Sequence, residues 1–119
     1  MIRLLAAAVM TAVALVAVPA QAAPQATVLK LTTAPGASMK YMTRSLSAKA
    51  GAVTIVMKNA SILPHNVAIK GNGVNAKGKI VGKGGVSTVT AKLKRGHYTF
   101  YCTVPGHEQA GMKGMLTVT

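Results

Sequence analysis

The stretch HYTFYCTVPGHEQAGM spans residues 97–112 and contains the single cysteine of the chain, Cys102. Side chains alternate between the two faces of a β-strand, so Tyr98, Phe100 and Cys102 share one face, and His97 points to the other. The aromatic residues indicate that their face meets the core, which places Cys102 at the end of a core-facing row. We therefore expect a strand over 97–102, an exposed His97, and a loop after Cys102.

Short alternating runs continue on both sides of this stretch. Gly, Pro and Asn separate them, and no segment has a convincing helical period. This pattern predicts an all-β fold, a seven- to eight-stranded Greek-key β-sandwich. The candidate strands are Thr27–Thr33, Arg44–Lys49, Val53–Lys58, His65–Lys70, Lys79–Val81, Ser87–Lys92, His97–Cys102 and Met115–Thr119.

The first 22 residues have the order of a secretory signal peptide. Arg3 precedes an apolar run from Leu4 to Val18, and Ala20-Gln21-Ala22 resembles a small-residue cleavage site. About 15 apolar residues are short for a membrane span, which needs roughly 20. We expect residues 1–22 to be removed, residues 23–119 to form one domain, and the protein to be periplasmic or otherwise exported without a stable membrane anchor.

The charge balance is strongly positive. Fourteen Lys and Arg residues face one acidic residue, Glu108, and there is no Asp. Glycosidases need two carboxylates, and hydrolytic triads need an orienting acid or a substitute, so this composition disfavours hydrolytic enzymes. We expect that the protein is not an enzyme. The charge predicts partners with acidic faces rather than nucleic acid, because the chain carries an export signal and has four aromatic residues. We expect Glu108 to be a solvated loop charge.

A lone cysteine in an exported protein is a metal ligand, a reactive thiol or an inert buried side chain. Here Cys102 is followed by His107 and then by Met112, with four residues between each pair. In the predicted strand at 65–70, His65 also ends a core-facing row. Two imidazoles, a thiolate and a weakly bound thioether are the ligands of a blue copper site. We therefore predict His65, Cys102, His107 and Met112 as copper ligands.

Other methionines of the sequence could also supply a sulfur donor. Met115 would point away from the core-facing residues of the last strand, so strand parity favours Met112. Met39 and Met42 suggest either a second Cu(I) site or core filling, and we expect core filling.

Two segments resemble the copper-binding segments of the cupredoxin family, of plastocyanin, azurin and auracyanin type. They are Leu63-Pro64-His65-Asn66-Val67 and the stretch from Tyr98 to Gly114. The resemblance implies one type 1 copper with His65, Cys102 and His107 as strong ligands and Met112 as the long axial ligand. It also implies that Asn66 hydrogen-bonds toward Thr103 and that His107 lies at the solvent edge, where electrons enter and leave.

Two departures from plant plastocyanins are visible. The Cys-to-His spacing is longer, as in auracyanin-like members, and the acidic patches are absent. The resemblance implies a monomeric one-electron carrier between redox proteins; the alternative is a periplasmic copper-binding or delivery protein. A multicopper oxidase is excluded, because the chain has three His, no His-x-His pair and no second domain.

Overall fold

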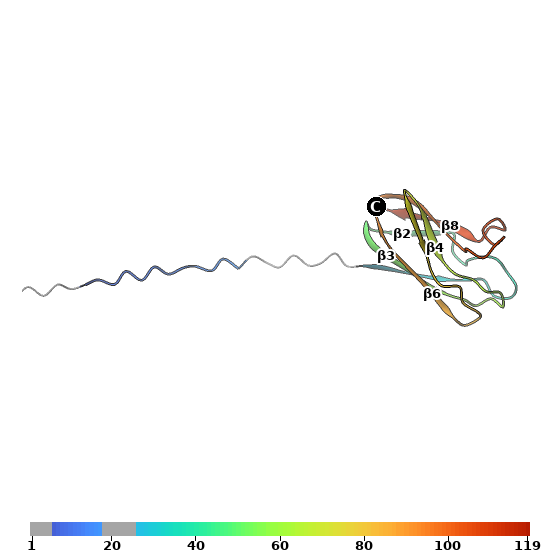
Figure 1. Cartoon of the computed structure of the whole chain (residues 1–119), viewed down its shortest axis with the longest axis horizontal. Helices are drawn as coiled ribbons and strands as arrows, with labels where there is room; N and C mark the ends of the chain where they lie inside the picture. The colour runs from blue at the N-terminus through green and yellow to red at the C-terminus, as the bar shows by residue number, and fades with distance from the viewer. Residues whose placement is uncertain (1–5, 18–25) are drawn as a thin grey trace, which may run out of the picture.

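The computed structural model describes residues 6–17 and 26–119 (Figure 1). The regular structure within these ranges is all β, with eight strands and no helix. Accordingly, the described ranges contain no helix that is long and apolar enough to cross a bilayer. The strands are β1 (Thr27–Thr32), β2 (Ser45–Ala48), β3 (Gly51–Lys58), β4 (Ala68–Gly71), β5 (Val74–Lys77), β6 (Val86–Leu93), β7 (Gly96–Tyr101) and β8 (Lys113–Val118).

The predicted signal peptide falls largely on residues that the structure does not describe. Residues 1–5 and 18–25, which include the predicted cleavage site Ala20-Gln21-Ala22, lie outside the described residues. Residues 6–17 are exposed and contain neither helix nor strand.

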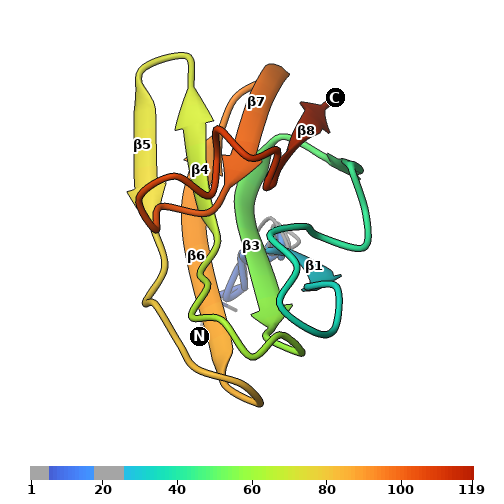
Figure 2. The same ribbon diagram turned by 90° about the vertical axis from the view of Figure 1, so that its right-hand side faces the viewer.

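The strands form two facing sheets, in the orders β1-β3-β6 and β2-β8-β7-β4-β5 (Figure 2). Strand β1 runs parallel to β3 and β2 runs parallel to β8, whereas the other neighbours are antiparallel. The chain passes repeatedly between the sheets, and its eight strands confirm the predicted seven- to eight-stranded Greek-key sandwich. Strand β8 lies inside its sheet, between β2 and β7.

Alternate residues of the central strands form the core. Ile55 and Met57 of β3 are fully buried, and so are Phe100 of β7 and Leu116 of β8 from the facing sheet. Burying each such side chain contributes about 1.5–3 kcal/mol. The predicted parity of the 97–102 strand is confirmed, because Phe100 is buried and His97 is exposed.

One predicted strand is wrong. The segment Lys79–Val81 is not a strand, and Val81 makes an isolated bridge with His65 instead. The outer neighbour of β4 in the sheet is instead β5, joined to it by the two-residue loop Asn72-Gly73. Both loop residues have positive φ, at 47° and 79°, which is the backbone of a type I′ hairpin turn. The predicted strand His65–Lys70 is correspondingly shorter, and regular pairing begins only at Ala68.

Candidate metal centre

Three of the four predicted ligands, His65, Cys102 and His107, lie close together. The loop between β7 and β8, which carries two of them, lies at the end of the sandwich that faces the reader in Figure 2. The Nδ1 atoms of His65 and His107 are 3.1 Å apart. The Sγ atom of Cys102 lies 3.8 Å from Nδ1 of His65 and 3.6 Å from Nδ1 of His107. The nearest point equidistant from these three atoms is about 2.0 Å from each, close to the bond from a metal such as zinc to imidazole nitrogen and somewhat shorter than the bond of about 2.3 Å to thiolate sulfur. The three donors therefore surround a space of the size of one metal ion.

Hydrogen bonds to backbone groups hold both the main chain and the ring of His65. Its N–H donates to the carbonyl of Val81 and its own carbonyl accepts from the N–H of Val81, while its Nε2 lies 3.2 Å from the carbonyl oxygen of Ser38. A carbonyl can only accept, so Nε2 carries the proton and Nδ1 presents a lone pair to the cluster. Burial lowers the pKa of the His65 imidazole; the bond to Ser38 opposes this shift, and the nearby His107 adds to it. His65 is thus neutral and oriented as a ligand.

Cys102 follows the last residue of β7 and is buried. Its backbone N–H donates to the carbonyl of Met112, which joins the two ends of the loop between β7 and β8. Burial raises the pKa of the Cys102 thiol, while hydrogen bonds from the backbone N–H groups of Asn66 and Val104 oppose this shift. These N–H groups stabilise the negative sulfur that a metal needs.

The loop between β7 and β8 is tightly folded. The N–H of His107 donates to the carbonyl of Val104, and the N–H of Met112 donates to the carbonyl of His107. Gly106 and Gly111 have φ values of 85° and 104°, in the left-handed region that favours glycine. The loop brings His107 back beside Cys102 and leaves it partly exposed, whereas Met112 is fully buried.

Strand parity selected Met112 over Met115, and the burial of the two residues agrees with this choice. Met112 is 0% exposed, whereas Met115 is 54% exposed on the outer face of β8. The prediction that Met39 and Met42 fill the core is wrong, because their side chains are 36% and 65% exposed. Both lie in the connection between β1 and β2, where the chain runs over the surface.

Asn66 ties the two ligand-bearing segments together, as the family resemblance implied. Its Nδ2 donates to the hydroxyl of Thr103 at 2.8 Å and to the carbonyl of Gly78 at 2.9 Å. Its Oδ1 accepts from the N–H of Thr103 at 2.8 Å, and its backbone carbonyl accepts from the hydroxyl of Tyr41 at 2.6 Å. These bonds hold the neighbours of His65 and Cys102 at a constant separation.

A second buried asparagine, Asn59, was not predicted from the sequence. Its Oδ1 accepts hydrogen bonds from the hydroxyl of Thr33 and from the N–H of Ser61, and its Nδ2 donates to the carbonyls of Leu63 and Val81. Leu63 lies two residues before His65 in the chain and Val81 is the bridge partner of His65, so Asn59 supports the position of this ligand. An asparagine between β3 and a proline-containing loop resembles any turn residue, and nothing in the sequence indicated its burial.

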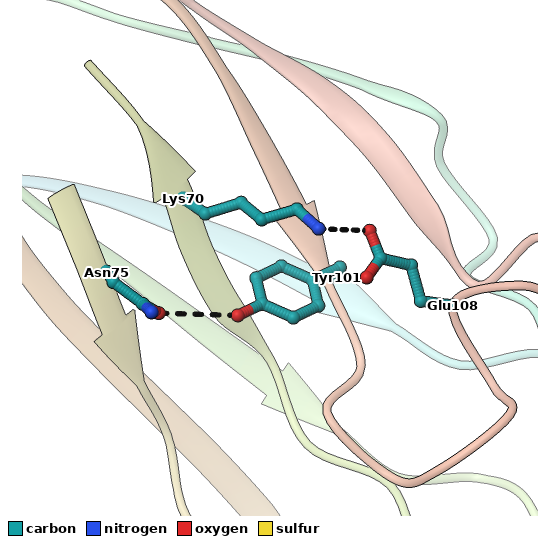
Figure 3. A network of polar contacts seen from close by, with 4 residues as sticks. All are labelled: Lys70, Asn75, Tyr101 and Glu108. Atoms are coloured by element: carbon teal, nitrogen blue, oxygen red, sulfur yellow. Dashed lines mark hydrogen bonds and ion pairs between the residues drawn. The ribbon is translucent and has the colours of Figure 1, made fainter. Parts of the chain in front are cut away.

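Glu108 is not a freely solvated charge, contrary to expectation. It forms an ion pair with Lys70 of β4, and the ammonium group of Lys70 lies 4.3 Å from the centre of the Tyr101 ring (Figure 3). The hydroxyl of Tyr101 in turn donates to Oδ1 of Asn75 at 3.3 Å. The residue after His107 is thereby attached to the outer face of the five-stranded sheet.

A β-sandwich with two imidazoles and one thiolate at one end, beside a buried methionine, has the fold and donor set of a blue copper protein. The family model of copper-binding proteins, plastocyanin/azurin family, matches residues 28–119. The chain therefore belongs to this copper-binding family.

Several solved structures are similar to this chain. The reduced auracyanin of Roseiflexus castenholzii is 26% identical, with 78% of this chain and 97% of that chain covered and a TM-score of 0.69. Auracyanin B is 25% identical, with coverages of 83% and 92% and a TM-score of 0.69. Auracyanin A of Chloroflexus aurantiacus, a blue copper protein, is 24% identical, with coverages of 80% and 100% and a TM-score of 0.68, and supports the fold. A comparison with curated protein sequences found no match.

The donor set fits copper in particular. Cys and Met supply soft sulfur donors that suit Cu(I), and imidazole nitrogen suits both oxidation states. The described cluster contains no carboxylate, the donor that Mg²⁺, Ca²⁺ and Mn²⁺ prefer. The residues present therefore match the type 1 copper of the family.

Proposed function

We propose that this protein is an exported one-electron carrier that holds one type 1 copper ion with His65, Cys102, His107 and Met112. The observation that carries this proposal is the convergence of three donor atoms in a buried cluster with one partly exposed edge. Copper, when bound, supplies a centre that alternates between Cu(I) and Cu(II). The family and the auracyanin relatives support this reading.

The role of the protein is to keep the donors in place. The Ser38 carbonyl holds the ring of His65, and Asn66 connects the segments of His65 and Cys102. Donors that cannot move far change little between oxidation states, so little reorganisation opposes electron transfer. The burial of His65, Cys102 and Met112 also excludes water and bulky substrates, which favours electron transfer over substrate turnover.

His107 is the one candidate ligand with a partly exposed side chain, and we propose its edge as the point where electrons enter and leave. Exposed apolar side chains lie next to the contacts of His65 at the same end. Met39 follows Ser38, Ile80 precedes Val81, and both side chains are partly to half exposed. Such a rim is suited to brief contact with a redox partner.

Export is supported by residues 1–22, whose charge, apolar run and small-residue site match a signal peptide. We propose that the mature protein begins near Ala23, acts as a monomer in the periplasm or outside the cell, and has no membrane anchor. If the chain is exported unfolded, it acquires copper after export.

The substitution Cys102→Ser tests the metal assignment. We expect it to abolish the intense thiolate-to-Cu(II) absorption of the copper-loaded protein, because oxygen replaces the sulfur donor. The matched control is His97→Gln, at an exposed histidine away from the cluster, which should leave the spectrum unchanged. A blue Cys102→Ser protein would contradict the assignment.

A copper-delivery role is the second candidate, because the partly exposed His107 is also a route by which the ion could leave. The two roles differ in how fast a chelator removes Cu(I). Slow removal together with reversible oxidation and reduction supports the carrier, whereas rapid removal by a soft chelator supports delivery.

A further inference from the structure

A groove of about 680 Å³ lies on the outer face of the five-stranded sheet. We call it the basic groove. Its lining includes the side chains of Arg44, Lys70, His97, Glu108, Lys113 and Met115. Its floor follows the register of the sheet, in which Lys70 of β4 lies opposite Thr99 of β7 and Thr99 lies opposite Met115 of β8. The loop between β7 and β8 borders it through Glu108.

The groove has cations without internal counter-charges. Glu108 is the one acidic residue of the sequence, and it pairs with Lys70 (Figure 3). No side-chain carboxylate therefore remains in the chain for Arg44 and Lys113, which are both exposed. Their charges can be neutralised only by solvent ions or by a partner.

The groove also offers an apolar surface between these charges. Met115 is 54% exposed in the middle of a strand, in a row that is otherwise polar. A flexible thioether side chain adapts its shape to a partner's apolar side chain. A ligand that places carboxylates against Arg44 and Lys113 and an apolar side chain against Met115 is a segment of polypeptide. A single nucleic-acid strand would instead need an exposed aromatic surface on which its bases could stack. Of the rings that line the groove, that of Tyr98 is buried, and the exposed imidazole of His97 is a single small ring rather than a stacking surface.

We propose that the basic groove is the docking site for an acidic segment of the redox partner protein, an inference that rests on the proposed function. A partner seated here touches the loop that carries three of the candidate ligands. Glu108 directly follows His107, and Lys113 directly follows Met112. Docking in the groove therefore places the partner against residues that directly follow His107 and Met112 in the chain.

The test is a titration of the ¹⁵N-labelled, Cu(I)-loaded protein with a short synthetic peptide of glutamates and one central leucine. The groove variant combines Arg44→Gln with Lys113→Gln. The control combines Lys30→Gln with Lys92→Gln, two exposed lysines on the three-stranded sheet, so both variants have the same net charge. We expect the peptide to shift the amide signals of Thr99 and Met115.

The groove variant should raise the Kd for the peptide about fivefold or more, whereas the control should change it less than about twofold. Equal losses in both variants would show diffuse attraction and overturn the proposal. Tighter binding of a single-stranded oligonucleotide or of phosphatidylserine vesicles to the groove would overturn it as well. No electron moves in this titration, so a negative result removes the groove and leaves the carrier proposal to the Cys102→Ser test.

Discussion

Removing the side chain of Asn66 is the sharpest test of how the candidate metal centre is held. The substitution Asn66→Ala deletes three hydrogen bonds, two to Thr103 and one to Gly78, and leaves the backbone bond from Tyr41 in place. At about 1 kcal/mol per bond, the loss in free energy of unfolding is about 3 kcal/mol. For a domain of this size, this lowers the melting temperature by about 12–24 °C.

Guanidinium unfolding of the copper-free protein measures this loss without a contribution from bound metal. The control is Asn75→Ala, at an exposed residue with one long hydrogen bond of 3.3 Å from Tyr101, where we expect less than about 1 kcal/mol. In the copper-loaded protein, Asn66→Ala should also weaken Cu(I) binding by about 10–100-fold in a chelator competition, because the two ligand segments are no longer joined. If Asn66→Ala costs no more than Asn75→Ala and binds Cu(I) normally, the reasoning is refuted.

Two further predictions concern packing near the centre. Met112→Ala should lower the free energy of unfolding of the copper-free protein by about 2–5 kcal/mol and alter the spectrum of the copper-loaded one. Met115→Ala should lower it by less than about 0.5 kcal/mol and leave the spectrum unchanged. Similar losses for both variants would contradict the parity assignment. In Gly114→Ala, the new Cβ would lie 2.1 Å from Cζ of Phe100, so we expect a lower denaturation midpoint and a loss of about 1–3 kcal/mol. Gly82→Ala is the control, since no described heavy atom lies within 4 Å of its Cβ, and a neutral Gly114→Ala would show that Phe100 can move aside.

The sequence predicted those features that depend on local periodicity. Alternation placed Phe100 in the core and His97 outside, and the same parity separated Met112 from Met115. The spacing along one loop was sufficient to predict that Cys102 and His107 lie together, because the loop is closed by its own backbone hydrogen bonds. These are short-range properties, which a single sequence contains directly.

The features that were not predicted depend on contacts between distant segments, or on a turn signal that the strand assignment did not use. The Asn72-Gly73 pair is the typical signal of a two-residue hairpin, but Lys79–Val81 was assigned as a strand instead of the residues after the turn. The ion pair between Glu108 and Lys70 joins residues 38 positions apart, a separation that no local pattern reports. The exposure of Met39 shows that hydropathy alone does not tell which loop residues reach the core.

The interior position of β8 has a consequence for how the fold closes. Strand β8 fills the gap between β2 and β7, and its Met115 pairs with Ser45 from the beginning of the fold. A folding chain in which β8 has not yet docked has an open sheet, with β2 unpaired within it. The hydrogen bond from the N–H of Cys102 to the carbonyl of Met112, which closes the loop before β8, is then also missing. Completion of the sheet and completion of the copper site are therefore a single step of folding, so a copper ion meets either an open chain or a finished site.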